Sequence, residues 1–545
     1  MTPIYLYDTT LRDGSQGESI TFSAEEKLFV ARKLDSCGFH YIEGGWPGSN
    51  PKDMKFFEMA QKVTFENARL TAFGATRKPG IDSGEDANIN ALIDSRAPVI
   101  AIFGKSWDLH VETIMGNTLE ENLAMIRDSV SYLKGHGREV VYDAEHFFDG
   151  FKANRQYTLN TIEAAALAGA DWIVLCDTNG GSLPFDIQSG TRAVIDMLDG
   201  LPRPKDGRPP PSVGIHTHND AAMAVANTIV AVQEGATMVQ GTVNGYGERC
   251  GNADITSIIP VLKLKMGLDC ISDANLSRLK SLSRFVSETA NQVPFSNRPF
   301  VGESAFAHKG GIHVSAIMKE PRAYEHIDPK LVGNDRRILM SDLAGKSNVV
   351  FKAREMGIAL ESNGTDSRDI VDKVKELEDQ GYQFDVADGS LKILLEKFTQ
   401  QYVPRFELKS FRVSIEKDEE LPCSAHATIK IAVGDNQEIT AAEGQGPVSA
   451  LDNALRKALV RFYPELKTMR LVDFKVRVID GRDATAAKVR VLIASRDQDE
   501  VWYTIGVSKD IIEASWQALT DSFQYKLAKE QGKRSSSAAL NSQAI

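Results

Sequence analysis

The chain has 545 residues, of which 42% are hydrophobic and 25% are charged, and it carries a formal net charge of −11. These values predict more than one folded domain with a sizeable core, and they exclude a chain that is disordered throughout. The acidic balance argues against a nucleic-acid-binding protein, and no apolar run is long enough to cross a membrane. The five cysteines form no C-x-x-C pair, which suits a reducing cytosol, so we expect a cytoplasmic protein.

The first half of the chain alternates between short apolar runs, typical of strands, and longer stretches with helical periodicity. Strands are predicted at residues 4–10, 41–45, 70–74, 99–104, 140–145, 172–176, 213–216 and 238–243. Helices are predicted between them, and Ser23 with Glu26 forms a capping box at one helix start; further helical stretches are 119–133, 158–168 and 221–234. This order predicts an α/β fold, a (β/α)8 TIM barrel over residues 1–270. An open doubly wound sheet is the alternative, but residues 9–14 lack its usual glycine-rich fingerprint.

The second half begins with a mostly helical region, predicted at 271–403, and continues with an internal repeat at 404–530. Helices are predicted at 366–380 and 390–401. Each unit of the repeat has three strands and a helix, at 411–416, 427–433, 438–442 and 447–462, and then at 473–479, 487–495, 500–507 and 509–525. Two βββα units suit a small sensor or dimerisation domain better than a catalytic one. The tail at 531–545 has no apolar periodicity and is predicted to be disordered.

Polar residues follow the carboxyl ends of the predicted strands, where a TIM barrel keeps its catalytic groups. They are Arg12, Asp13, Gln16, Glu43, Lys105, Glu145, His146, Asp177, Thr178, Asn179, His216, His218, Asn244, Glu248, Arg249 and Asn252. Closure of the barrel makes the seventh, eighth and first strands neighbours. It therefore brings together four potential metal ligands, which are Asp13, His216, His218 and Asn252.

His216 and His218 stand two residues apart at a strand end, so their imidazoles point to the same side. With one carboxylate and one amide oxygen they form a mixed nitrogen and oxygen set. Such a set suits a divalent metal ion with open positions for substrate, and we expect Mg or Mn, with Zn or Co as alternatives. The competing interpretation is that Asp13 caps the following segment and the histidines form hydrogen bonds within the core.

Three motifs of the chain resemble the signatures of the metal-dependent acyl-CoA condensing and lyase barrels. They lie at residues 8–16 (DTTLRDGSQ), 216–220 (HTHND) and 245–253 (GYGERCGNA). The family includes the 2-isopropylmalate, homocitrate and citramalate synthases and hydroxymethylglutaryl-CoA lyase. Residues 44–53 and 144–154 look like the long-form citramalate synthases in particular, and residues 305–313 look like the synthases' linker, which reaches into a neighbouring subunit's active site.

The resemblance implies condensation of acetyl-CoA, the co-substrate, with pyruvate and water to give (R)-citramalate and CoA. Arg12, beside Asp13, is placed to stabilise the developing alkoxide, and Gln16 and Thr178 are expected to bind substrate. By resemblance Glu145 is the base, relayed through His313 and Tyr324 of a second subunit. Two simpler roles stay open, because Arg12 could form only a strand-end salt bridge and Glu145 could only orient a neighbour.

The resemblance also implies a homodimer whose C-terminal domain binds an end-product amino acid. Citramalate can supply the carbon skeleton of isoleucine, so we expect isoleucine as the feedback effector, with leucine as the alternative. A domain that only holds the dimer together is the simpler interpretation. Rival functions are a 2-isopropylmalate synthase acting on 2-oxoisovalerate, a lyase, and a non-catalytic amino-acid sensor, although the lyases lack the linker and the repeat.

Overall fold

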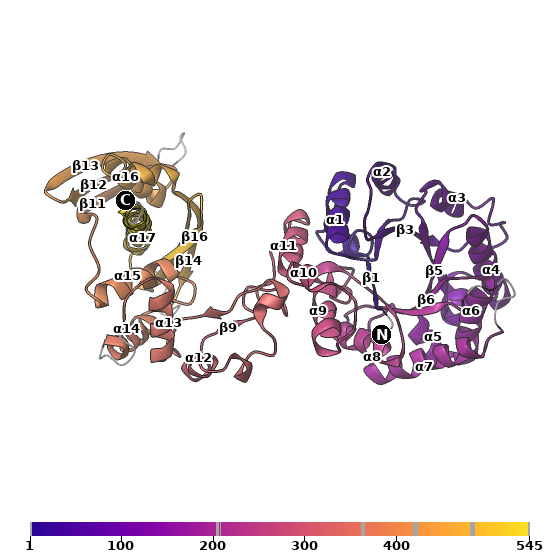
Figure 1. Ribbon diagram of the computed structural model, residues 1–545. Coiled ribbons are helices and arrows are strands. Elements are labelled where there is room, and N and C mark those ends of the chain that lie inside the picture. The colour runs from indigo at the N-terminus through magenta and orange to yellow at the C-terminus, as the bar shows by residue number, and fades with distance from the viewer. Residues whose placement is uncertain are drawn as a thin grey trace. The chain divides into compact units, whose positions relative to one another are not determined.

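The computed structural model describes residues 3–202, 207, 209–360, 366–417, 423–479 and 486–542. Contacts divide the chain into two units (Figure 1). Unit 1 comprises residues 1–306 and 327–335, and unit 2 comprises residues 307–326 and 336–545. The predicted boundary at residue 270 therefore does not separate the units, because residues 271–306 also belong to unit 1. In the part of the chain that is described, no helix combines the length and the apolar character that a bilayer span requires.

Unit 1 contains a closed barrel of eight parallel strands in chain order, which confirms the predicted (β/α)8 fold and excludes the doubly wound sheet. Strand β1 pairs with both β2 and β8, so the first and last strands close the barrel. The strands are β1 (Tyr5–Asp8), β2 (Tyr41–Gly45), β3 (Arg69–Ala75), β4 (Val99–Lys105), β5 (Glu139–Glu145), β6 (Trp172–Asp177), β7 (Ser212–Thr217) and β8 (Met238–Gly241).

The helices of unit 1 surround the barrel (Figure 1). They are α1 (Ala24–Ser36), α2 (Pro51–Ala60), α3 (Ala87–Asp94), α4 (Leu119–Gly135), α5 (Phe147–Ala153), α6 (Arg155–Ala168), α7 (Pro184–Gly200), α8 (Ala224–Glu234), α9 (Ile255–Pro260), α10 (Asp273–Leu276) and α11 (Leu279–Thr289). The predicted capping box is present, because the Ser23 hydroxyl accepts from the Glu26 amide and the Glu26 carboxylate accepts from the Ser23 amide. Helix α8 starts three residues later than predicted because Ala222 has a φ of 58°, which a right-handed helix does not allow.

The barrel separates two apolar layers through the alternation of its strands. One set of side chains packs outward against the helices, as Leu6 and Ile215 do. The other set forms a cluster inside the barrel that includes Tyr7, Tyr41 and Trp172. Because this cluster fills the interior, the open space of the barrel lies at the carboxyl ends of the strands, where the polar residues gather.

Unit 2 combines helices with two antiparallel three-stranded sheets. Its helices are α12 (Gly311–Ile317), α13 (Lys346–Glu355), α14 (Asp366–Asp379) and α15 (Asp388–Phe398). The sheets are β11 (Glu407–Glu416), β12 (Ser424–Val433) and β13 (Asn436–Gly444), followed by α16 (Pro447–Leu459), and β14 (Arg470–Val478), β15 (Val489–Arg496) and β16 (Val501–Ser508), followed by α17 (Ile511–Ser542). This order confirms the predicted pair of βββα units.

The prediction of a disordered tail from residue 531 is wrong as far as residue 542, because α17 continues to Ser542. The helix is started by a packed segment in which Leu519, Phe523 and Leu527 are buried. Once a helix is nucleated, each further residue costs little, and alanine and lysine are good helix formers. The absence of apolar periodicity therefore did not predict where the helix ends. Residues 543–545 of the predicted tail lie outside the described residues.

Candidate metal centre and active site

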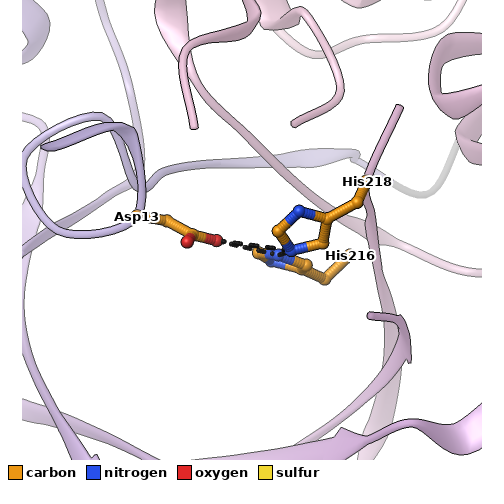
Figure 2. Close-up of side chains that lie close together, drawn as sticks. All are labelled: Asp13, His216 and His218. Carbon is orange, nitrogen blue, oxygen red and sulfur yellow. Dashed lines mark hydrogen bonds and ion pairs between the residues drawn. The ribbon is translucent and has the colours of Figure 1, made fainter. Parts of the chain in front are cut away.

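Asp13, His216 and His218 meet at the mouth of the barrel, where the segment after β1 lies beside the end of β7 (Figure 2). One ligand atom from each residue lies within 4.8 Å of the others. Asp13 Oδ2 is 3.1 Å from His216 Nε2 and 3.7 Å from His218 Nε2. The three residues are at most 6% exposed, so their polar atoms face one another and not water. The predicted convergence across about 200 residues of sequence is therefore present.

Asn252 completes this cluster from the segment after β8. Its Nδ2 donates to Asp13 Oδ2 at 2.8 Å and lies 3.1 Å from His216 Nε2, while its buried Oδ1 has no hydrogen-bond partner. Leaving a buried acceptor unpaired is costly. Rotation of the Asn252 side-chain amide by 180° exchanges Oδ1 and Nδ2 without changing the shape of the side chain. Asn252 can therefore offer its oxygen to a cation beside Asp13 and His216. The four residues thus fit a divalent metal ion.

The surroundings of the two histidines turn Nε2 of His216 toward Asp13 and keep His218 neutral. His216 Nδ1 donates to Gln240 Oε1 at 2.8 Å, so Nε2 is the nitrogen that faces Asp13 and would bind a cation. Burial lowers the pKa of His216, but the hydrogen bond and the charge of Asp13 outweigh it and raise the pKa. Burial and the neighbouring His216 lower the pKa of His218 to about 4, so this imidazole is neutral at pH 7. Burial raises the pKa of Asp13, but the charge of Arg12 and the hydrogen bond from His216 outweigh it and hold the pKa well below its usual value.

Gln240 is itself fixed by a buried carboxyl. Its Nε2 donates to Asp143 Oδ1 at 3.4 Å, and both side chains are almost fully buried. Because Asp143 takes the amide nitrogen, the amide oxygen of Gln240 faces His216. Burial and the charge of Glu43 raise the pKa of Asp143 to about 7. The positioning roles of Gln240 and Asp143 were not predicted, because each is a single polar residue in a predicted apolar strand.

Arg12 is fixed on three sides at the edge of the same cluster. Its Nε donates to Glu43 Oε1 at 2.6 Å, one of its terminal nitrogens lies 3.2 Å from Asp13 Oδ1, and its Cζ lies 3.8 Å from the centroid of the Phe73 ring. Glu43 is fully buried and also accepts from Thr9 at 2.6 Å and from Tyr7. Arg12 therefore forms the strand-end salt bridge of the simpler interpretation and also presents its charge to the barrel mouth.

A pocket of about 240 Å³ opens beside Arg12 and the metal ligands. Its polar lining includes the predicted residues Gln16, Glu145 and Thr178, and its apolar lining is a wall of Trp46, Phe73 and Phe103. This aromatic wall was not predicted from the sequence, because aromatic residues in barrel strands usually belong to the hydrophobic core. Their position at the carboxyl ends of β2, β3 and β4 is the signal that could have identified them.

Glu145 and Thr178 are both oriented by neighbours. The Glu145 carboxylate forms an ion pair with Lys105, which lies opposite it in the register of β4 and β5. Thr178 Oγ1 accepts from the His146 amide at 2.9 Å, so its own proton is free to be donated to a ligand. His146 adopts a φ of 56°, and its Nδ1 donates to Asp149 Oδ2 at 3.0 Å. The side chains of Glu145 and Thr178 are therefore both held in place, and both line the pocket.

His313 and Tyr324 belong to unit 2 and not to the barrel unit. Their rings stack with centroids 4.3 Å apart, and Tyr324 is 46% exposed. The segment that carries them is held by Glu325, which is buried and pairs with His308 at 3.1 Å and Arg336 at 2.6 Å. The expected contribution of His313 and Tyr324 to a neighbouring subunit's active site stays a prediction.

Three family models match consecutive parts of the chain. An HMGL-like model matches residues 3–286, a homocitrate synthase post-HMGL domain-like model matches residues 300–382, and a LeuA allosteric (dimerisation) domain model matches residues 385–527. The chain belongs to the HMGL-like family. The barrel model ends near α11, and the third model covers both βββα units, so the matches follow the architecture described above.

Full-length relatives narrow this assignment. The chain is 52% identical over 530 residues to the (R)-citramalate synthase of Aquifex aeolicus, which covers 97% of this chain and 98% of that protein. It is 44% identical over 528 residues to the one of Sulfolobus acidocaldarius, with 97% of each covered. A probable 2-isopropylmalate synthase of Methanopyrus kandleri is 32% identical over 517 residues, 94% of this chain and 96% of that one. This places the chain among the citramalate synthases, which are acyltransferases, and argues against a non-catalytic sensor.

Proposed function

We propose that the protein condenses acetyl-CoA with pyruvate and water to give (R)-citramalate and CoA, as a step of the pyruvate route to isoleucine. The observation that carries this proposal is the small pocket in which the charged groups face an aromatic wall. Trp46, Phe73 and Phe103 pack with ring centroids 5.5 to 5.7 Å apart. A wall packed this closely suits the methyl group of pyruvate and opposes the branched group of 2-oxoisovalerate.

The first task of the site is to bind the 2-oxo acid and prepare its carbonyl. A divalent ion held by Asp13, His216, His218 and Asn252, which we propose to be Mg or Mn, would polarise that carbonyl as a Lewis acid when bound. Thr178 and Gln16 donate hydrogen bonds to the substrate carboxylate. Arg12 supplies positive charge to the oxygen that becomes the alkoxide, and its three fixed contacts mean that it needs no reorganisation during the reaction.

The second task is to remove a proton from the methyl group of acetyl-CoA, which is a weak acid. Glu145 is the base, and Lys105 fixes its carboxylate at the pocket edge. The methyl carbon then forms a bond with the carbonyl carbon of pyruvate, and the alkoxide gains a proton. His313 and Tyr324 from a second subunit would relay protons to and from Glu145. Water finally cleaves the thioester and releases CoA.

Release of the CoA thiol tests this proposal directly. The full-length protein is assayed with acetyl-CoA and, in turn, pyruvate, 2-oxobutanoate and 2-oxoisovalerate, each with added Mg or Mn. Pyruvate is expected to give the highest kcat/KM. A higher kcat/KM with 2-oxoisovalerate would support a 2-isopropylmalate synthase instead, and no thiol release with any acid would reject the condensation.

We further propose that the protein is a cytoplasmic homodimer inhibited by isoleucine through residues 404–530. The LeuA allosteric (dimerisation) match to residues 385–527 supports a dimer, and the described cysteines, all unpaired, suit a reducing compartment. Deleting the chain after residue 403 would expose α15, which packs against α17 and β16. Point variants of the full chain are therefore the better test of where an effector acts.

A further inference from the structure

The tryptophan of the aromatic wall is held by hydrogen bonds at its ring and at its backbone. Trp46 Nε1 donates to Asn88 Oδ1 at 2.6 Å, and the Trp46 amide donates to Asp53 Oδ2 at 2.9 Å. Asn88 belongs to α3 and Asp53 to α2. Two helices that contribute no residue to the pocket lining therefore fix one of its side chains.

Asn88 has a defined orientation because both ends of its amide are used. Its Nδ2 donates to the Ala75 carbonyl at 2.8 Å, so Oδ1 is the end that faces the indole of Trp46. A reversed amide would bring two donors together at Trp46 and two acceptors together at Ala75. The space is also small, since a Cβ added to Gly74 would lie 2.9 Å from Asn88 Oδ1. The indole therefore has one fixed acceptor.

A buried ion pair fixes the backbone that carries Trp46. Lys27 of α1 donates from Nζ to the Gly44 carbonyl at 2.9 Å and pairs with Asp53, and both charged side chains are buried. Gly45 has a φ of 146°, and a Cβ there would overlap the Asp53 carboxylate, so the close approach of α2 to β2 requires glycine. Breaking a buried ion pair is strongly destabilising. Variants of this pair would therefore test folding, and the hydrogen bond to the indole is the better contact to remove.

The ring of Trp46 lies edge-on to the two phenylalanines of the wall. Its plane makes an angle of 85° with Phe73 and 81° with Phe103, whereas the two phenylalanine rings lie at 22° to each other. Turning the indole about its bond to Cβ would change how much of the pocket it fills. The hydrogen bond from Nε1 opposes that turn, because it has the correct geometry in only one orientation of the ring.

We propose that Asn88 is a positioning residue that sets the choice of 2-oxo acid through the ring of Trp46. With the hydrogen bond present, the indole keeps one orientation and leaves room for the methyl group of pyruvate. Without it the ring turns, and the ethyl group of 2-oxobutanoate is accepted more readily. The inference rests on the proposed function, because it takes a 2-oxo acid to be the ligand of the barrel pocket.

Selectivity between pyruvate and 2-oxobutanoate tests this role in the full-length protein. Asn88→Ala is expected to narrow the ratio of the two kcat/KM values by at least about fivefold, which corresponds to the loss of one ordinary hydrogen bond. A general loss of activity cannot produce this change, because it lowers both values alike. Asn90→Ala is the matched control, since Asn90 lies on the same helix but donates to the Gly84 carbonyl at 3.1 Å. It should keep the parent ratio.

A double-mutant cycle with Trp46→Phe shows whether Asn88 acts through the indole. Phenylalanine has no ring donor, so Asn88→Ala should change the ratio little in the Trp46→Phe background. An equal change in both backgrounds would mean that Asn88 acts by another route, and this would overturn the proposal.

Binding measured without turnover separates this inference from the proposed reaction. Isothermal titration calorimetry of the full-length protein, with Mn and without acetyl-CoA, gives the dissociation constants of pyruvate and 2-oxobutanoate. A protein that releases no CoA, but in which Asn88→Ala narrows the ratio of these constants, would reject the condensation and support the role of Asn88. A parent ratio retained in Asn88→Ala, an equal change in Asn90→Ala, or a parent that binds neither acid would overturn that role.

Discussion

The barrel pocket beside Arg12 and a pocket of unit 2 lined by α14, α15, β16 and α17 differ in how their charged groups are satisfied before any ligand arrives. In the barrel, Arg12 already has Glu43, Asp13 and the Phe73 ring around it, and Asp13 already faces two histidines. In the unit 2 pocket, Asp521 accepts from the Ser390 hydroxyl and forms no ion pair among the described residues, although the charge of Lys397 acts on it. A catalytic site gains from groups that are fixed in advance, because they need no reorganisation during the reaction.

The largest expected effect tests the fixed cluster of the barrel. Asp13→Asn and His216→Ala are expected to lower kcat at least about 1,000-fold, because metal ions contribute several kcal/mol to charge stabilisation and each 1.4 kcal/mol is about tenfold in rate. Activity and bound metal, measured by elemental analysis, should fall together. His136→Ala, an exposed histidine at the end of α4, is the control. A variant that kept metal and turnover would show that this cluster is structural.

A loss of about 10²–10⁴-fold in kcat is expected for Glu145→Gln, because general bases contribute rate factors of this size. Metal content should stay unchanged, since Glu145 pairs with Lys105 and not with the metal ligands. Exchange of the acetyl-CoA methyl protons with deuterium, followed by NMR, reports the base without the later steps. If the exchange continued at the parent rate, Glu145 would be only an orienting residue.

The aromatic wall is expected to set substrate choice. The parent should prefer pyruvate to 2-oxoisovalerate by at least about 100-fold in kcat/KM. A substrate that merely lacks a methylene group loses about 10–200-fold in kcat/KM, and a tightly packed pocket excludes added groups more strongly than this. Phe103→Ala removes one side of the wall and should narrow that ratio at least tenfold. The ratio is the decisive quantity, because a general loss of activity cancels in it. An unchanged ratio would assign selectivity to other residues.

A smaller effect, of about 10–100-fold in metal affinity, is expected for Gln240→Leu, because it removes the acceptor that orients His216. Competition with a chelating dye measures this affinity apart from activity. Gln240→Glu keeps the acceptor oxygen and should retain most of the affinity. Equal affinity in Gln240→Leu and the parent would mean that the tautomer of His216 is set without Gln240.

The sequence predicts those parts of the structure that depend on local pattern or on barrel closure. Apolar runs located all eight barrel strands, and closure then brought Asp13 to His216 and His218. The sequence did not predict contacts that depend on which side chains meet inside the fold. Glu43 lies at a predicted strand end, but its hydrogen bond with Arg12 depends on the register of the barrel strands, which the sequence does not show. The hydrogen bond of Ser390 with Asp521 joins residues 131 positions apart, through a packing of helices that no local pattern shows.

Detection of the product tests the central claim most directly. The full-length protein is incubated with acetyl-CoA, pyruvate and Mg or Mn, and the product is separated on a chiral column and identified by mass. We predict (R)-citramalate in an amount equal to the CoA released, and none with His216→Ala. Release of CoA without citramalate would show simple thioester hydrolysis and would contradict the assignment of Arg12, Glu145 and the metal ligands to carbon–carbon bond formation.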